Sequence, residues 1–534
     1  MKVKYQLPIV FFVFVFMVRI VYAQENNSPA NEFLSKSVWP IGHTNTGQTN
    51  ATNISGPTGP TKRLTAEEIQ YQDMGQFQLG QVISGKYTDG KRAIWCNGSS
   101  FVAKLDYDNY NIISLLRITD AVENTGYHED LIAYMDSDAK MNDKIKKALK
   151  SGFIGGMSSV YMMMNHENNF VAAIPRGVRV YGDVIKGNIS SGIKIVYEYQ
   201  LPETIQGQVC GMNMTYDGRI IVVTDEGFVI SISEDFKDIK SIEMKHRNDK
   251  MSKKNKTVKF VRNSIAIDKN GGIYVASVNH MHKIIWDGSD LTNDESKGAW
   301  TSAYPNKLGL GSGSTPALMG FGEGNDQFVV ITDGDNVMNM TLFWRNEIPN
   351  DWSGIEGLPS IRIAASYPVN FGNEDAKYIQ QEQGVTIDNY GCIVVNNVSI
   401  NVPGKIKLIS KAKPKAMWAF MGYMNGFEQF APHGIEKLIW DSKTRKMTVA
   451  WINQEVSDPT CVPFVALGNN MFYTIGSRAN EFTFEGINSE TGESVFHYII
   501  GGARYNGFYS APTLDDEGRI LYGGTWGLVR LTPK

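Results

Sequence analysis

Short apolar runs alternate with turns that contain Asp and Gly from about residue 80 to the end of the chain. In four segments an Asp is followed one to three residues later by a Gly, and then by a run of β-branched or aromatic residues. This order is typical of a β-hairpin, because a Gly at positive φ allows a tight turn between two antiparallel strands. The four segments are 216–223, 267–275, 387–395 and 514–522.

The spacing of these hairpins predicts a β-propeller. Strand, turn and strand recur at intervals of roughly 40 to 60 residues, which suits four-stranded blades. We expect an all-β chain that forms a single β-propeller of seven or eight four-stranded blades, with eight favoured. The candidate blades lie near 80–116, 152–200, 207–244, 262–303, 313–366, 382–420, 430–500 (long enough for two) and 508–534.

Two segments depart from the strand pattern. Residues 136–150 (DSDAKMNDKIKKALK) contain many helix formers and predict a short helical insertion between blades. Residues 24–75 are rich in Asn, Thr, Gly and Pro and predict an extended N-terminal arm before a propeller at 76–534. The last candidate blade needs one more strand, and we expect residues 38–45 to supply it and close the ring.

The first 23 residues predict a secretory signal peptide. Lys2 and Lys4 precede an apolar run at 7–18, and residues 21–23 (VYA) suit cleavage. The run is shorter than the roughly 20 residues of a membrane helix, and Arg19 interrupts it; an uncleaved anchor is the alternative. We therefore expect a secreted or periplasmic protein that has no membrane span after cleavage.

Composition and charge narrow the class of partner. Cleavage would remove three basic residues and change the formal net charge from −3 to about −6. No nucleic-acid partner is expected, because such a partner requires a basic face, and the basic run 250–259 is interpreted as a solvated loop. Cys96, Cys210, Cys392 and Cys461 allow three disulfide pairings or free thiols. A chain of this length buries a large core without disulfides, and we expect a monomer.

Short motifs in the chain resemble the PQQ-like (quinoprotein-type) β-propeller superfamily. They are WPIGHTNTG at 39–47, GSTPAL at 313–318, SAPTLD at 510–515 and YGGTWGLVRL at 522–531. The resemblance covers most of the mature chain in its rhythm, and it implies the architecture more than an activity. The quinone-dependent dehydrogenases of this superfamily often use an adjacent cysteine pair near the cofactor, and this sequence has none. A quinone-dependent oxidoreductase is therefore the least favoured function.

Polar residues of several blades are expected to meet around the central channel. Inner strands of a propeller begin at the face where the second and third strands of each blade are joined, and ligands usually bind there. We therefore expect a ligand site made from both kinds of loop. The second-to-third-strand turns supply Asn279, His280, His282, Asp333, Asp335, Arg478 and Trp526, and the starts of inner strands supply Arg262, Ser314, Glu382, His433 and Tyr509.

A metal site is one hypothesis within this set. His280 and His282 are separated by one residue, so in an extended strand both imidazoles share one face and can bind one metal ion. Asp333, in the run TDGDN, resembles part of a calcium loop but lacks the downstream Glu of an EF-hand. With Asp225, these residues form the predicted site for a divalent metal such as calcium. Plain polar turns are the alternative.

Catalysis is a second hypothesis. Glu382 and His433 would form an acid–base pair if the ring brought them together; a Glu bonded to neighbouring backbone is the alternative. The sequence contains no GxSxG elbow, Walker loop or dinucleotide fingerprint. The leading interpretation is an exported propeller that binds a small molecule or a partner protein at the channel without chemistry. A metal-dependent propeller hydrolase or lactonase is the alternative.

Overall fold

The fold was analysed in a computed structural model. It describes residues 27–74, 80–98, 101–117, 127–151, 161–249, 258–322, 324–413, 415–459 and 461–534. The predicted signal peptide lies outside the described residues. Among the helices of the described part, none has the length and apolar character that a membrane crossing requires.

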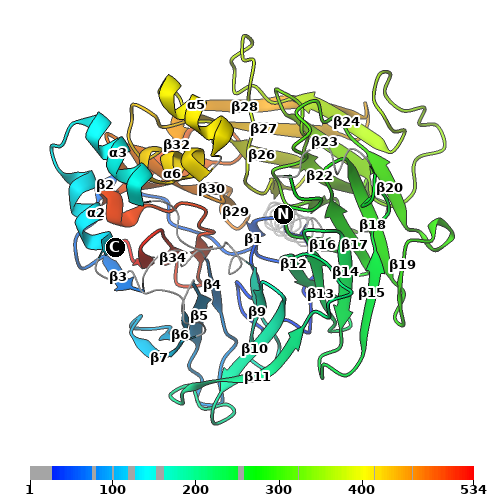
Figure 1. The fold of residues 1–534 in the computed structure, drawn as a ribbon, viewed down its shortest axis with the longest axis horizontal. Helices are drawn as coiled ribbons and strands as arrows, with labels where there is room; N and C mark the ends of the chain where they lie inside the picture. Colours follow the sequence, from blue (N-terminus) through cyan, green and yellow to red (C-terminus); the bar gives the residue numbers. More distant parts are fainter. Residues whose placement is uncertain are drawn as a thin grey trace, which may run out of the picture.

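Eight sheets stand radially around a central axis (Figure 1). In the described ranges seven sheets are built on four successive antiparallel strands, and the eighth combines three successive strands with β3 from the N-terminal arm, so the fold is the all-β propeller with the eight blades that the sequence favoured. Blade 1 consists of β4 (Gly80–Ile83), β5 (Ala93–Asn97), β6 (Phe101–Asp106) and β7 (Ile112–Arg117), and blade 2 of β8 (Met162–Met164), β9 (Phe170–Ile174), β10 (Gly177–Asp183) and β11 (Ile193–Gln200). Blade 3 consists of β12 (Val209–Met214), β13 (Ile220–Thr224), β14 (Phe228–Ile232) and β15 (Ile239–Glu243). Blade 4 consists of β16 (Ala266–Ile267), β17 (Gly272–Ala276), β18 (His280–Trp286) and β19 (Leu291–Thr292), with β20 (Trp300–Ala303) beside β18.

The other four blades complete the circle. Blade 5 consists of β21 (Ala317–Met319), β22 (Phe328–Thr332), β23 (Asn339–Trp344) and β24 (Ile363–Pro368), and blade 6 of β25 (Thr386–Asp388), β26 (Gly391–Val395), β27 (His433–Asp441) and β28 (Lys446–Ser457). Blade 7 consists of β29 (Phe464–Ala466), β30 (Met471–Arg478), β31 (Glu481–Asn488) and β32 (Ser494–Gly501). Blade 8 consists of β33 (Thr513–Leu514), β34 (Ile520–Gly523) and β35 (Gly527–Leu531), with β3 (Ile69–Asp73) as the outermost strand. Two short 3-10 turns, η2 (Glu295–Lys297) and η3 (Ala503–Tyr505), lie in loops.

A strand from the N-terminal arm closes the ring. β3 pairs antiparallel with β35, from Ile69 opposite Leu531 to Asp73 opposite Gly527. Our expectation that residues 38–45 supply this strand was wrong. The two other arm strands, β1 (Ala51–Thr52) and β2 (Lys62–Arg63), pair in parallel with the inner and the outer strand of blade 7. The arm therefore ties the two ends of the chain together over blades 7 and 8.

Residues 39–52, which we call the channel floor, run around the inside of the ring. Their carbonyl oxygens accept hydrogen bonds of 2.7 to 3.0 Å from seven consecutive blades. Because most of residues 38–45 belong to this segment, which bonds the inner strands, they do not supply the strand that completes blade 8. The bonds join Trp39 to Ile83, Pro40 to Met164, Thr46 to Asn213 and Ile267, Gly47 to Leu318, Thr49 to Ile387 and Asn50 to Val465.

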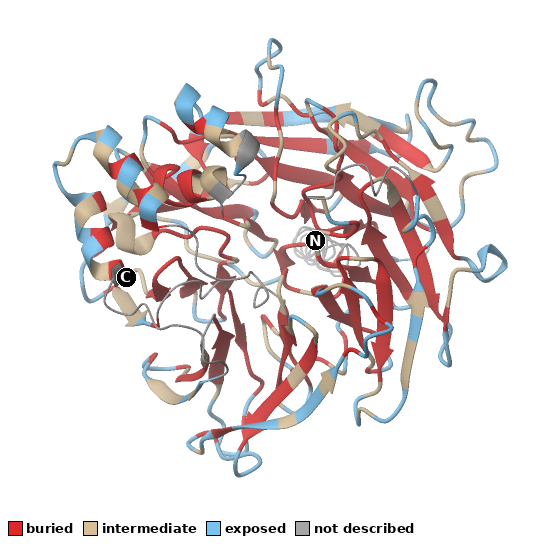
Figure 2. Ribbon diagram, in the orientation of Figure 1, coloured by how far each residue is buried: buried red, intermediate tan, exposed pale blue. Residues whose placement is uncertain are grey.

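Burial follows from face-to-face packing of the blades (Figure 2). The second strands β13 and β26 are buried at every residue, because neighbouring blades cover both of their faces. This explains the continuous apolar runs that follow each Asp–Gly turn in the sequence. The outermost strand β11 instead exposes most of its residues, so it carries the alternating polar pattern.

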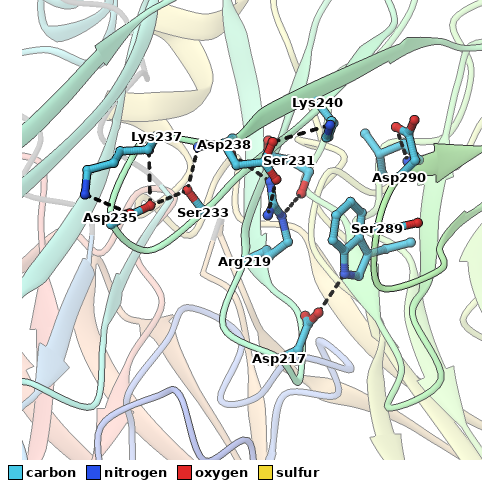
Figure 3. Close-up of polar contacts among 12 residues, drawn as sticks. Asp217, Arg219, Ser231, Ser233, Asp235, Lys237, Asp238, Lys240, Ser289 and Asp290 are labelled. Atoms are coloured by element: carbon cyan, nitrogen blue, oxygen red, sulfur yellow. Dashed lines mark hydrogen bonds and ion pairs between the residues drawn. The ribbon is translucent and has the colours of Figure 1, made fainter.

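The Asp of the repeated turn also joins neighbouring blades, as Figure 3 shows for blades 3 and 4. Asp217, in the turn between β12 and β13, accepts a hydrogen bond of 2.7 Å from Nε1 of Trp286 at the end of β18. The guanidinium of Arg219 lies 4.3 Å from the Trp286 ring and bonds Ser231. The same type of joint links blade 6 to blade 5, where Trp440 donates to Asp326 at 2.9 Å.

Four helices form a cluster beside blades 7 and 8 (Figure 1, upper left), and this cluster includes Trp526 of blade 8. In the sequence, α2 (Tyr127–Asp136) and α3 (Met141–Ser151) come after the last strand of blade 1 and before the first strand of blade 2. α3 corresponds to the insertion predicted at 136–150. α5 (Gly404–Ala412) and α6 (Lys415–Met424) interrupt blade 6 between β26 and β27. We assigned 382–420 and 430–500 to separate blades, which was wrong: blade 6 extends to Ser457, and the helices form the apolar cluster that a strand pattern did not reveal.

Candidate functional site

Four side chains from alternate blades meet at the face where the inner strands begin. Tyr161, Arg262, Glu382 and Tyr509 stand one to four residues before β8, β16, β25 and β33, the inner strands of blades 2, 4, 6 and 8. We call these four residues the channel mouth. The sequence predicted Arg262, Glu382 and Tyr509 at this face, and the structure brings them within electrostatic reach of one another.

An ion pair bridges the channel mouth between blades 4 and 6. Nη2 of Arg262 lies 2.9 and 3.1 Å from the two carboxylate oxygens of Glu382, and Nη1 donates to the carbonyl of Leu310 at 3.1 Å. The attraction of Glu382 raises the pKa of Arg262. The two side chains are 26% and 30% exposed, so both charges are held in place and can still be reached from outside.

Aromatic rings flank the ion pair. Tyr509 adopts a left-handed φ of 56°, which is uncommon for a bulky residue and is a feature of functional sites. Its ring stacks on Trp418 of α6, with centroids 5.4 Å apart. Burial and the charge of Glu382 raise the pKa of Tyr509, against the effect of Arg262. Tyr509 therefore keeps its hydroxyl proton and can act as a hydrogen-bond donor.

The channel floor contacts the inner strands a short distance along them from the channel mouth. Ile267 and Ile387, which bond the floor, follow Arg262 and Glu382 by five residues, a distance of at most about 16 Å along a strand. His43 of the floor is buried, and its Nδ1 lies 2.8 Å from Oδ1 of Asn50. Burial lowers its pKa, so the imidazole is neutral.

The predicted acid–base pair is divided between two places. Glu382 belongs to the channel mouth, whereas His433 begins β27 and its Nδ1 lies 2.9 Å from the carbonyl oxygen of Glu455. Within the described ranges no hydrogen bond connects Glu382 with His433. Arg478 and His433 instead share the neighbour Glu455, because Arg478 bonds the Glu455 carboxylate at 2.7 Å. Arg478 also bonds both carboxylate oxygens of Glu485, at 2.8 and 2.9 Å.

The predicted histidine pair lies on β18. The His280 ring stacks on His246, with centroids 4.2 Å apart and planes 9° apart, and it is 6.0 Å from the His282 ring. His282 is buried, and its Nε2 lies 2.9 Å from Oγ of Ser277. Burial lowers the pKa of both residues, for His280 to about 4. The stack places the faces of the His246 and His280 rings together, which is unlike the arrangement of metal ligands, whose nitrogen lone pairs converge.

The acidic residues predicted to complete that metal site have local partners. Oδ2 of Asp225 lies 3.1 Å from Nζ of Lys259. Asp333 accepts two hydrogen bonds of 2.8 and 2.7 Å from Asn339, and burial raises its pKa to about 6. For the part of the chain that is described, no cluster of three donor atoms within 4.8 Å contains His280, His282 or either of these Asp residues.

The remaining predicted ligand-binding residues lie in the expected turns between second and third strands, and they too bond to neighbours: Asn279 to Asn306, Asp335 to Lys307 and Trp526 to Ala503. Sequence reasoning missed Tyr161, Trp418 and His43. Tyr161 occupies the position before an inner strand and could have been found by that rule. Trp418 lies in a segment that was assigned to a strand, and His43 lies in the opening motif.

No protein-family model matches the chain. The chain is 32% identical over 515 residues to an uncharacterized protein of Archaeoglobus fulgidus, and the alignment covers 94% of this chain and 89% of the archaeal protein. The chain belongs to the family of this archaeal protein. This relationship gives the family a propeller fold but brings no activity with it.

Solved structures with a similar fold include quinohemoprotein alcohol dehydrogenases. The Comamonas testosteroni enzyme has a TM-score of 0.50 and 12% identity, with 95% of this chain and 80% of that chain covered. An enzyme from Pseudomonas putida HK5 has a TM-score of 0.49 and 10% identity, with 96% and 78% covered. At this identity the likeness shows the PQQ-like propeller fold alone.

The residues of the channel mouth do not fit a quinone cofactor of the kind that the resemblance implied. The adjacent cysteine pair is absent from the sequence. All four cysteines are free; Cys96, Cys392 and Cys461 are buried, and Cys210 is partly buried. Burial raises the pKa of the Cys96 thiol to about 12, so this thiol is inert at neutral pH. In addition, the cation at the mouth is already paired with a carboxylate.

Proposed function

We propose that this family member is an exported β-propeller that binds a small, planar, polar molecule at the channel mouth. The observation that carries the proposal is the convergence of Tyr161, Arg262, Glu382 and Tyr509 from four alternate blades. Side chains that serve only to pack blades contact a neighbouring blade, whereas the Arg262–Glu382 pair joins blades 4 and 6, and Tyr161 and Tyr509 interact with this group from blades 2 and 8.

The chemistry of the mouth indicates the class of ligand. Arg262 and Glu382 offer a cation and an anion that are partly exposed, so a ligand with an acidic or a basic group can exchange with either partner. Tyr509 and Trp418 present stacked rings beside the ion pair, and flat aromatic faces favour a planar ligand. A pocket that combines aromatic faces with a few placed polar groups is typical of small-molecule sites.

Export is the second part of the proposal, and the N-terminal sequence supports it. Expression of the full chain in a bacterial host, followed by N-terminal sequencing of the extracytoplasmic fraction, tests it. We expect the protein in that fraction to begin at Gln24. Protein that stays in the cytoplasm with Met1 retained would contradict export and would leave the binding proposal untouched.

Binding is tested by a thermal-shift screen of the purified protein with a panel of aromatic carboxylates and aromatic amines. Compounds that stabilise the wild type should lose their effect with Arg262→Gln or Glu382→Gln. The matched control is Arg63→Gln, which breaks the bidentate Arg63–Glu481 pair on the outside of blade 7, where the side chains are 56% and 34% exposed. This control should respond to the compounds as the wild type does.

Two outcomes would contradict the binding proposal. One is a panel in which no compound shifts the melting temperature of the wild type. The other is a set of hits that stabilise Arg262→Gln and Glu382→Gln as strongly as they stabilise Arg63→Gln, because such hits bind elsewhere on the molecule.

A further inference from the structure

Three segments far apart in the sequence meet beside the strand that closes the ring. Asp73 is the last residue of β3, His128 and Glu129 lie in the first turn of α2, and Arg504 lies in η3. In Figure 1 α2 and β3 lie together at the left of the view, close to the C-terminus. Sequence analysis assigned no role to any of these residues.

The donor atoms of Asp73, His128 and Glu129 all lie within 4.8 Å of one another. Nε2 of His128 is 3.0 Å from Oδ2 of Asp73 and 3.6 Å from Oε1 of Glu129. Two ligands that each lie about 2.0 to 2.2 Å from one Zn²⁺ in tetrahedral geometry are themselves roughly 3.3 Å apart. The two separations from His128 lie on either side of this value, and the third pair of atoms lies within 4.8 Å, which is compatible with one shared cation.

The histidine is held in a fixed orientation. The side chain of His128 is 0% exposed, and its ring stacks on the Trp526 indole at 5.9 Å with planes 18° apart. Tyr423 also stacks on the Trp526 indole, at 5.6 Å. A buried imidazole whose ring plane is locked by aromatic neighbours presents Nε2 in one direction, as ligands in metal sites do.

The carboxylates lie on the open side of the cluster. The side chains of Asp73 and Glu129 are 44% and 45% exposed, which provides a path by which an ion can enter. Arg504 bonds both carboxylate oxygens of Glu129, at 2.8 and 2.6 Å. The carboxylate is thus held in one orientation, although Arg504 also offsets one of the two negative charges. The partner of Glu129 orients it in the manner of an outer-shell residue.

We propose that Asp73, His128 and Glu129 form a binding site for one divalent transition-metal ion, with Zn²⁺ preferred, that clamps the closing strand β3 to α2. One imidazole and two carboxylates are a ligand set that Zn²⁺ accepts, with water in the fourth position. Because β3 is an edge strand that pairs with β35 on one side alone, a metal bond at its end stabilises the closure of the ring. The site is structural, and it is independent of the ligand proposed for the channel mouth.

The test uses the full mature protein after treatment with EDTA and buffer exchange. Isothermal titration with ZnCl₂ should show one saturable site per chain, and the melting temperature should rise with Zn²⁺ concentration, because an ion that binds the folded state alone stabilises it. Asp73→Asn and His128→Gln remove a ligand, and each should weaken Zn²⁺ binding by more than the roughly 10- to 100-fold that loss of an outer-shell residue costs.

A matched control separates this site from any surface histidine beside an acid. His166 lies 2.6 Å from Glu234, with the two side chains 38% and 45% exposed, and in the described residues this pair belongs to no cluster of three donors. His166→Gln should bind Zn²⁺ as tightly as the wild type does. Asp73→Asn changes a half-exposed side chain, so its circular dichroism and cooperative melting check that lost binding is not lost folding.

Three results would overturn the proposal. They are the absence of saturable Zn²⁺ binding by the wild type, equal Zn²⁺ affinity of folded Asp73→Asn and wild type, and a melting temperature that does not respond to Zn²⁺. Binding of CaCl₂ in preference to ZnCl₂ would also overturn it, because an imidazole ligand disfavours Ca²⁺.

Discussion

A buried ion pair between blades 1 and 2 allows a sharp test of how the blades are held together. Nζ of Lys104 on β6 lies 2.6 Å from Oδ1 of Asp183 on β10 and 2.7 Å from the carbonyl oxygen of Ser191. The two side chains are 0% and 6% exposed. The substitution Lys104→Met keeps an apolar stem of similar length but leaves the Asp183 carboxylate buried without its counter-charge.

The expected cost follows from this burial. Removal of one partner from a buried pair destabilises a protein by about 3 to 5 kcal/mol, whereas replacement of both partners by apolar residues is often neutral. Unfolding entropy near 60 °C is about 2.1 cal/mol/K per residue, so roughly 500 residues that unfold as one unit give about 1 kcal/mol/K. Lys104→Met should therefore lower the melting temperature by about 3 to 5 °C.

Differential scanning calorimetry of three variants checks the reasoning. Lys104→Met should show the full loss, and the double variant with Asp183→Leu should recover most of it. The control Lys186→Met breaks the Lys186–Glu167 pair, whose side chains are 78% and 41% exposed, and exposed pairs contribute about 0 to 1 kcal/mol. Equal melting temperatures of Lys104→Met and Lys186→Met would contradict a stabilising role of the buried Lys104–Asp183 pair. A double variant that is the least stable of the three would contradict it as well.

Two further predictions concern pH and the joints between blades. Burial, with His246 beside it, holds the pKa of His280 at about 4, below its ordinary 6.5. Between these values the unfolded chain binds a proton that the folded chain does not, so stability present above pH 6.5 is lost as the pH falls toward 4. Melting curves of His280→Asn should depend less on pH over this range than those of the wild type, and an equal dependence would contradict the assignment. Trp286→Phe removes the hydrogen bond to Asp217 and should cost about 1.5 to 3 kcal/mol, the range for a bond to a charged group. By calorimetry Trp352→Phe, which loses a 3.0 Å bond to the carbonyl of Ile361 near the surface, should cost less; the reverse order would refute the role of the joint.

Much of the blade architecture could be predicted from local patterns. Each Asp–Gly turn specifies a hairpin through its own backbone geometry, and packing on both faces explains the apolar strand that follows it. The insertion at α5 and α6 was missed because KAMWAFMGYM at 415–424 is apolar enough to pass as a buried strand. Its helical state depends on the cluster that it forms with α2, α3 and Trp526.

The candidate site could be predicted in part. The rule that inner strands begin at one face located Arg262, Glu382 and Tyr509. His280 and Asp333, which were predicted from the turns between second and third strands, instead contact His246 and Asn339. The rule could not reveal which of the residues at that face interact with residues of other blades. That outcome depends on how many blades close the ring and how far each side chain reaches.

The sequence by itself determined the hairpins and the repeat, and it limited the blade number to seven or eight, because a turn and the strands beside it need only their neighbours along the chain. The tertiary structure alone decided which residues meet. Arg262 and Glu382 are 120 residues apart, and Glu129 and Arg504 are 375 apart. The tertiary structure alone also decided the path of the arm around the channel and the identity of the strand that closes the ring. Such contacts arise only when all the blades have closed into a circle, since no local propensity selects one distant partner over another.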